Sequence, residues 1–176
     1  MTSTDGTTWT ERWQGPSWQG FTKAIFANNR FVVVGGFGKI VTSQDGISWS
    51  DASIYADDDF NGIAYGQGQF VVVGDNGTVY ISSDGTSWTN QQYGYYNSLK
   101  DIIFTQDGFV AVGYAEDEYM NDYCYLKTSK DGIYWNDEIL SVKGWLYGIT
   151  YAQNSYVVVG DYILQAFSTY SSPVQK

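Results

Sequence analysis

The sequence predicts an all-β fold, a β-propeller of four four-stranded antiparallel blades in one chain, and three observations predict it. First, one phrase occurs four times: an aromatic residue, a β-branched run ending on glycine, and an Asp-Gly turn followed by a tryptophan. Second, the glycines that end the run, Gly35, Gly74, Gly113 and Gly160, lie 39, 39 and 47 residues apart. Third, a composition with 20 glycines and 16 tyrosines favours strands and turns over helices. Four short strands at this period are typical of propeller blades.

Each repeat resolves into four strands. The first alternates apolar and polar residues and ends on an aromatic, as at Phe60, Ile63 and Tyr65, which indicates one buried face. A short turn leads to the second strand, the β-branched run, which is apolar on both faces and is expected in the interior of its sheet. A third strand follows, and the Asp-Gly turn leads to the fourth, which holds the tryptophan. No segment carries a helical apolar stripe, so we expect few helices.

The fourth repeat is split between the two ends of the chain. The repeats cover residues 14–53, 54–92, 93–140 and 141–176, and residues 1–13 supply the missing part of the last one. The chain ends at Lys176 before a fourth strand, whereas Thr7 to Trp13 form a fourth strand with no preceding three. We therefore expect the N-terminal strand to close the last blade, because an unpaired edge strand promotes aggregation. Two chains could instead exchange this strand and form an eight-bladed homodimeric ring; we favour the monomer, which needs no partner.

A short motif precedes each fourth-strand tryptophan. Asp before Gly suits a tight turn, in which the glycine takes a positive φ and the carboxylate accepts backbone N–H groups. The tryptophans are predicted to be buried between neighbouring blades, where an indole covers about 150–250 Å². The four motifs comprise Ser3, Asp5, Gly6 and Trp9; Ser43, Asp45, Gly46 and Trp49; Ser83, Asp84, Gly85 and Trp88; and Ser129, Asp131, Gly132 and Trp135.

This motif resembles the Asp-box, also called the bacterial neuraminidase repeat, of sialidase-like β-propellers. The usual family spacing has one more residue between the aspartate and the glycine. In that family the box is a structural element at the periphery of the blade, so the resemblance implies a fold and says little about activity. It also implies that a sialidase would hold the substrate carboxylate with three arginines. This chain has only two, Arg12 and Arg30, and therefore lacks the sialidase catalytic set.

Composition excludes several classes of function. A formal charge of −10 disfavours binding to nucleic acids and anionic membranes. No apolar run reaches the roughly 20 residues of a membrane span, and no signal peptide is recognisable, so we expect no membrane insertion. The chain has no histidine and a single cysteine, Cys124, which gives no zinc site and no activated thiol. We therefore expect no catalytic residue, no metal and no cofactor, and the compartment is left open.

Two clusters of acidic residues could support glycoside hydrolysis or Ca²⁺ binding. They are Asp57, Asp58 and Asp59 in one linker, and Glu116, Asp117, Glu118 and Asp122 in the third repeat. Glycoside hydrolysis needs two carboxylates about 5–10 Å apart. Clustered acids on loops are usually solvated, and neither cluster matches a 12-residue Ca²⁺ loop. A glycoside hydrolase is therefore the least favoured reading.

Aromatic residues gather on the linkers between blades. These linkers share one face of a propeller with the loops between strands 2 and 3, opposite the Asp-Gly turns. The eight extra residues of the third repeat are predicted as a long hairpin loop on this face, Tyr114–Tyr123. Aromatic platforms among polar residues suit protein contact or sugar stacking. The predicted ligand or partner face comprises Trp13, Trp18, Tyr55, Tyr93, Tyr95, Tyr96, Tyr119 and Trp145.

The function that we expect is a non-catalytic binding or structural module, which uses this aromatic face for contact with a partner protein in an assembly. The alternative is a carbohydrate-binding lectin or adhesin, including a component of a virion surface, with a neutral glycan as its ligand. Both readings use the same aromatic residues, so the sequence leaves them open.

Overall fold

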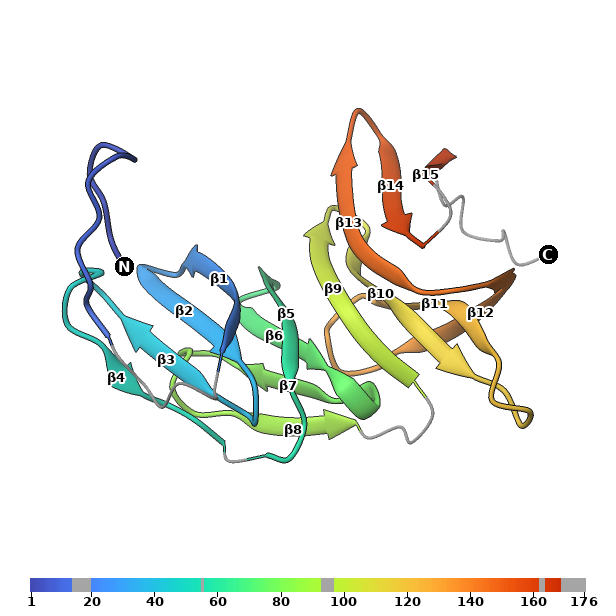
Figure 1. Cartoon of the computed structure of the whole chain (residues 1–176), viewed down its shortest axis with the longest axis horizontal. Coiled ribbons are helices and arrows are strands. Elements are labelled where there is room, and N and C mark those ends of the chain that lie inside the picture. Colours follow the sequence, from blue (N-terminus) through green and yellow to red (C-terminus); the bar gives the residue numbers. More distant parts are fainter. Residues whose placement is uncertain (14–19, 55, 93–96, 162–163, 169–176) are drawn as a thin grey trace.

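The structure is a computed structural model that describes residues 1–13, 20–54, 56–92, 97–161 and 164–168. Four antiparallel sheets follow one another along an arc, and we number these sheets blades 1 to 4 (Figure 1). Within the described ranges the helical content is one 3-10 turn, η1 (Asp75–Gly77). The predicted all-β propeller of four blades is confirmed.

Each blade is built from consecutive strands paired in sequence order. Blade 1 contains β1 (Phe21–Ala27), β2 (Arg30–Gly35), β3 (Ile40–Ser43) and β4 (Ser50–Asp51). Blade 2 contains β5 (Phe60–Gly66), β6 (Gln69–Gly74), β7 (Val79–Ser82) and β8 (Thr89–Gln92). Blade 3 contains β9 (Asn97–Thr105), β10 (Gly108–Glu116), β11 (Asp122–Ser129) and β12 (Asn136–Lys143). Blade 4 contains β13 (Leu146–Ala152), β14 (Ser155–Gly160) and β15 (Leu164–Ser168).

The core lies between the blades, and the second strand of each blade supplies most of it. In β6 both faces are covered: Phe70 and Val72 pack against blade 1, while Val71 and Val73 pack against blade 3. All four side chains are fully buried. A third apolar cluster, around Val112 and Val158, joins blades 3 and 4. The β-branched run is therefore an interior strand, as its two apolar faces predicted.

The glycine that ends this run is required by the close approach of two backbone segments. A Cβ atom on it would strike the carbonyl oxygen at the point where the first strand enters the same blade. The register of the first and second strands also shifts at this point in every blade. The pairs of glycine and carbonyl are Gly35 with Gly20, Gly74 with Asp59, Gly113 with Ser98, and Gly160 with Trp145.

One buried carboxylate ties three blades together. Asp101 on β9 accepts a hydrogen bond from Lys23 Nζ on β1 at 2.9 Å and from the backbone N–H of Ile149 on β13 at 3.2 Å. Asp101 is almost fully buried, so these bonds form in a low-dielectric setting where each is strengthened. They help to fix the curvature of the arc.

The Asp-Gly turns have the predicted geometry at all four positions. The turn glycines have φ between 71° and 74°. In the first blade Asp45 Oδ1 accepts the N–H groups of Ile47 and Ser48, both at 2.8 Å, and Ser43 Oγ accepts that of Gly46 at 2.8 Å. The same contacts recur in the other three turns.

The serine assigned to the second motif was wrong. Ser82 rather than Ser83 donates to Asp84 and accepts the Gly85 N–H at 2.8 Å. The hydroxyl must lie three residues before the glycine to reach its N–H, and Ser82 has that spacing.

The prediction that all four motif tryptophans are buried was also wrong. Trp9 is 58% exposed, while Trp49, Trp88 and Trp135 are half-buried. The rings of these three pack on the aromatic residue that begins the second strand of their own blade, with centroids 6.2–6.4 Å apart. The indoles therefore cover the end of a blade and are not wedged deeply between two blades.

The N-terminal strand does not close the last blade in this structure. The described part of blade 4 has three strands, and Thr2 pairs with Thr10 instead. This pairing is local: the motif turn folds the chain back on itself, so both partners lie in the same short segment. Residues 1–13 lie beside blade 1, at the opposite end of the arc from β15 (Figure 1).

Half of the predicted long loop Tyr114–Tyr123 belongs to strands, the first three residues to β10 and the last two to β11. β10 and β11 remain paired from Phe109↔Ser129 to Glu116↔Asp122, so the extra residues lengthen both strands. Only a tight turn is left, in which Asp117 Oδ1 accepts the N–H groups of Tyr119 and Asn121 at 2.8 and 2.9 Å. Strand pairing satisfies the backbone polar groups that an irregular loop would leave to solvent.

Candidate aromatic binding site

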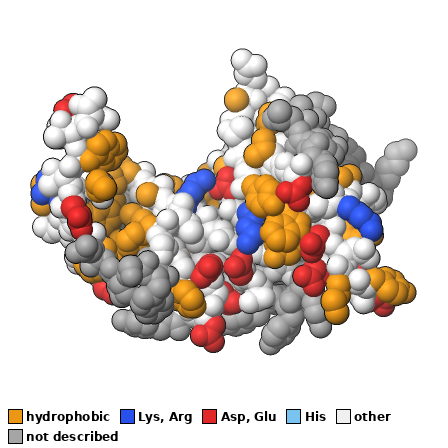
Figure 2. Space-filling view, viewed as in Figure 1, with side chains coloured by type: hydrophobic (Ala, Val, Ile, Leu, Met, Phe, Trp, Pro, Cys, Tyr) orange, Lys and Arg blue, Asp and Glu red, His pale blue; other side chains and the backbone are white. Residues whose placement is uncertain are grey.

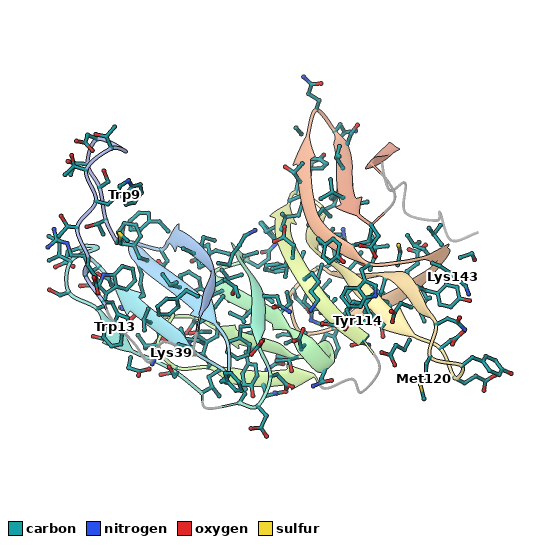
Figure 3. All side chains as sticks on the ribbon, in the orientation of Figure 1. Trp9, Trp13, Lys39, Tyr114, Met120 and Lys143 are labelled. Atoms are coloured by element: carbon teal, nitrogen blue, oxygen red, sulfur yellow. The ribbon has the colours of Figure 1, made fainter. Side chains whose placement is uncertain are left out.

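The strongest candidate site lies where the first strand of blade 4 begins, at the border with blade 3. Trp145 precedes β13 and stacks on Tyr114 of β10, with ring centroids 4.3 Å apart and an interplanar angle of 9°. Trp145 Nε1 donates to Asp122 Oδ2 at 2.7 Å. The lengthened strands β10 and β11 carry Tyr114 and Asp122, so the insertion in the third repeat builds the support for the indole. Figure 3 shows Tyr114 on blade 3, close to the ribbon of blade 4.

A lysine and an aspartate border the stacked pair. Lys100 Nζ lies 5.5 Å from the centroid of the Tyr114 ring and donates to Asp75 Oδ1 at 2.7 Å. Asp75 also accepts from Asn61 Nδ2 at 2.8 Å and from the Ser98 hydroxyl. Burial opposes ionisation of Asp75, but the hydrogen bonds from Lys100, Ser98 and Asn61 outweigh it, so the pKa of the carboxyl lies below its ordinary value. Asp75 is therefore a fixed negative charge.

A second aspartate lies on the other side of Trp145. Asp161 Oδ1 accepts from the Tyr147 hydroxyl at 2.8 Å, and Asp161 Oδ2 accepts from the backbone N–H of Trp145 at 3.3 Å. The hydrogen bond to Asp161 raises the pKa of Tyr147, which stays a neutral donor. The Tyr147 ring meets Trp145 edge-on, with centroids 6.1 Å apart. Figure 2 shows the resulting apolar patch with basic and acidic side chains at its border.

A narrow cleft opens beside the indole, between the ends of β12 and β14. Its walls are almost entirely apolar and include Leu140, Val142 and Val158. Cys124 lies in the cleft, where burial and the nearby charge of Asp161 raise the pKa of its thiol. A protonated thiol is a poor nucleophile, so Cys124 contributes apolar surface here. Together, the stacked aromatics, the mouth of the small cleft and the flanking aspartates offer contacts for an extended segment with one small apolar side chain and one cation.

Of the predicted aromatic face, the structure describes Trp13, Tyr119 and Trp145, and these three do not lie together. Trp13 packs over Lys39 in blade 1, with the Nζ atom 5.6 Å from the ring centroid, at the far end of the arc from Tyr114, on which Trp145 stacks (Figure 3). Tyr119 is 76% exposed at the tip of the β10–β11 hairpin, next to Met120. The remaining predicted residues, Trp18, Tyr55, Tyr93, Tyr95 and Tyr96, lie outside the described residues.

Several residues of the site were missed from the sequence. Tyr114 was treated only as the boundary of an insertion, and Tyr147, Lys100 and Asp75 were not considered. A signal was present: Lys100 and Tyr147 occupy the same position of the repeat, directly after Leu99 and Leu146. Tyr114 and Asp161 likewise follow the glycines Gly113 and Gly160. Comparing these repeat positions would have gathered the four residues at one end of the blades.

Several of the acids that were considered for glycoside hydrolysis or Ca²⁺ hold turns in place. Asp58 accepts hydrogen bonds from Asn76 Nδ2 and Thr78 Oγ1, and Asp59 accepts the backbone N–H of Phe37 at 2.9 Å. Asp117 caps the β10–β11 turn, and hydrogen bonds from Asn121 and Tyr119 lower its pKa. Within the described ranges, no group of three or more Asp, Glu or Cys residues is arranged to hold a metal ion.

Comparison with known proteins supports the β-propeller fold, and it bears on the fold alone. No family model matches the chain, and no curated protein matches it. A solved structure described as YCF48 bound to D1 peptide is similar with a TM-score of 0.58 and 18% identity, over 85% of this chain and 50% of that one. YCF48 from Cyanidioschyzon merolae is similar with a TM-score of 0.57 and 12% identity, over 90% of this chain and 59% of that one.

These similarities place the chain among β-propellers. The chain spans about half the length of the two structures that it resembles. No comparison bears on the Asp-box resemblance, which stays a prediction. Among the described residues, no helix has the length and apolar character needed to cross a membrane.

Proposed function

We propose that this chain is a non-catalytic protein-binding module that holds a peptide segment of its partner at the surface formed by Trp145, Tyr114, Tyr147 and the adjoining cleft. The observation that carries the proposal is the Trp145–Tyr114 stack, fixed by the hydrogen bond from the indole to Asp122. Rigid aromatic anchors next to an apolar cleft give most of the affinity in protein interfaces. One structure of similar fold is described as bound to a peptide, which favours the same use here.

The charges around the stack define the chemistry of the partner. Asp75, Asp122 and Asp161 surround it, and Lys100 is already paired with Asp75. The whole chain also carries a formal charge of −10. The partner segment is therefore basic, with an apolar side chain for the cleft and an arginine that can stack on an aromatic ring and bond to a carboxylate.

The surroundings of the acids support a binding role over catalysis. Hydrogen bonds within and between turns occupy the carboxylates of Asp58, Asp59 and Asp117. This is typical of carboxylates with a structural role. The thiol of Cys124 is held in its protonated form by burial. A glycan ligand has less support than a peptide, since one face of the Trp145 ring and its N–H group are already occupied by Tyr114 and Asp122.

A displayed library of short random peptides, selected against the purified chain, tests the proposal. We expect enrichment of basic peptides with an apolar or aromatic residue, and calorimetry with the synthesised peptides should give a saturable isotherm. Trp145→Ala should weaken binding by at least about tenfold, or 1.4 kcal/mol, and Asp161→Asn should weaken the binding of basic peptides while leaving the side-chain shape unchanged.

Trp9→Ala is the matched control, because Trp9 is an exposed tryptophan at the other end of the arc. Its peptide affinity should equal that of the parent chain. A selection that enriches no peptide, or peptides that bind the Trp145→Ala protein as tightly as the parent, would refute the proposal. Retention of a neutral glycan on an array, lost on Trp145→Ala, would show the lectin alternative to be correct.

A further inference from the structure

Successive blades in this chain pack through one interface that occurs three times. We call the side of a blade that faces the next blade in the sequence its downstream side, and the opposite side its upstream side. The downstream side presents two valines of the second strand, and the upstream side of the next blade presents apolar side chains of its first strand. In the first interface Val32 and Val34 meet Phe60 and Ile63. In the second, Val71 and Val73 meet Leu99 and Ile102. In the third, Val110 and Val112 meet Leu146 and Ile149.

The two ends of the arc carry the unmatched halves of this same interface. On the upstream side of blade 1, the equivalents of Phe60, Ile63 and Tyr65 are Phe21, Ala24 and Phe26. Phe21 is 42% exposed and Phe26 is 56% exposed, whereas Phe60 is fully buried. On the downstream side of blade 4, the equivalent of the buried Val34 is Val159, which is 43% exposed. Large apolar side chains left in solvent at matched positions mark an interaction surface.

The N-terminal segment lies at the same end of the arc as the exposed Phe21 and Phe26. Residues 1–13 lie beside blade 1 (Figure 1) and carry an intact motif turn, which the Thr2–Thr10 bridge closes. The described part of blade 4 ends with its third strand, β15.

We propose that two copies of this chain close a single ring, in which the downstream side of blade 4 in each copy packs on the upstream side of blade 1 in the other. The valine pair Val157 and Val159 then covers Phe21 and Phe26, as Val32 and Val34 cover Phe60 in the chain itself. The occupant is a second copy because the two exposed faces are the two halves of one interface. Such a head-to-tail contact closes with two-fold symmetry when the rotation of two arcs completes a circle.

Two independent facts favour this occupant. The chain spans 50% and 59% of the two propellers that it resembles, so the four blades described here match about half of a ring of that size. The inner strands β1 and β5, β5 and β9, and β9 and β13 pack successively, while the exposed β1 lies across an opening from blade 4 in Figure 1. The inference does not depend on peptide binding, and its test uses no peptide.

The oligomeric state in solution tests the inference. Light scattering coupled to size-exclusion chromatography should give twice the chain mass of 19.7 kDa. Phe26→Asp alters one half of the interface and Val159→Asp alters the other, so each variant alone should elute with the mass of one chain. An equimolar mixture of the two variants should regain the doubled mass, because one of the two interfaces in the mixed pair then has both of its halves intact.

Met120→Asp is the control, since Met120 is an exposed apolar residue at the tip of the β10–β11 hairpin, away from both faces. It should retain the doubled mass. Circular dichroism and a denaturant titration establish that each variant is folded. A parent chain with the mass of one copy at every concentration overturns the inference, whether its arc closes on itself or is completed by other repeats. A polydisperse series of larger species, or two variants whose mixture stays at the mass of one chain, overturns it as well.

Discussion

Lys127 Nζ donates to Asp137 Oδ1 at 2.6 Å, although the lysine side chain is buried and the carboxylate is half-exposed. The pair joins β11 to β12 at directly opposed positions of the sheet. A lysine in this position is stable only while a counter-charge accompanies it, because burial of an unpaired ammonium costs several kcal/mol.

Asp137→Asn should therefore lower the free energy of unfolding by about 2 kcal/mol, a value between those of a fully buried and a surface ion pair. Lys127→Met should cost less, because it removes the buried charge together with its need for a partner. Urea titrations of both variants measure the difference. If Lys127→Met is the more destabilising of the two, the lysine is held mainly by contacts other than Asp137.

The motif aspartates make stability depend on pH in acid. Hydrogen bonds from the backbone N–H groups of Ser48 and Ile47, and from Ser43, lower the pKa of Asp45 to about 2 from an ordinary value of 3.8. A carboxyl group with a depressed pKa in the folded state contributes stability above its unfolded pKa, and this contribution is lost as the pH falls toward the folded value. The aspartates of the other three turns are shifted in the same direction.

The free energy of unfolding should consequently fall between about pH 4 and pH 2. Asp45→Asn removes one of the titrating groups, so its stability should decline less steeply over this interval. Gln44→Ala, at an exposed position of the same turn that carries no titrating group, is the matched control and should follow the parent curve. Identical slopes for the parent and Asp45→Asn would show that the motif hydrogen bonds contribute nothing to the pH dependence.

Two of the motif tryptophans should differ in their contribution to stability. Trp49 is half-buried on Phe31 and donates to the Gly46 carbonyl at 3.2 Å, whereas Trp9 is mostly exposed. Trp49→Ala should cost about 2 kcal/mol, less than full burial would imply, and Trp9→Ala less than about 0.5 kcal/mol. Denaturant titration monitored by circular dichroism measures both. Equal losses would mean that Trp9 packs in solution as the other tryptophans do.

The repeat made the fold predictable, while the site depended on contacts between repeats. Spacing and strand periodicity gave the four blades, and the Asp-Gly turns gave the positive φ of Gly46 and its equivalents. The burial of Trp9 was wrong because the other motif tryptophans pack on an aromatic residue in the second strand of their own blade, and residues 1–13 contain no such strand. Trp145 was predicted, but its partner Tyr114 was missed because the two rings meet through the packing of blades 3 and 4, and only a comparison of equivalent repeat positions would have placed Tyr114 at this end of the blades.

The same reasoning accounts for the two topological corrections. The N-terminal segment carries the same motif in either arrangement. The sequence therefore cannot show whether Thr2 pairs with Thr10 or whether this segment closes blade 4. The insertion in the third repeat was predicted as a loop because it interrupts the period. Its alternation at Tyr114, Glu116, Asp122 and Cys124 allows the two strands simply to continue.

The repeat glycines give the most direct test of the blade geometry. Gly113 has an ordinary backbone conformation, so an alanine there would meet no torsional strain; its Cβ would instead collide with the backbone of Ser98 and Leu99, which cannot move away without breaking the β9–β10 ladder. Gly113→Ala should therefore lower the free energy of unfolding by at least about 2 kcal/mol. Gly20→Ala is the matched control, because a Cβ at Gly20 meets no atom within 4 Å, and it should leave stability unchanged. Denaturant titration of the two variants side by side distinguishes a steric requirement from a general effect of replacing glycine, and a Gly113→Ala protein as stable as the Gly20→Ala protein would contradict the close approach of the two strands.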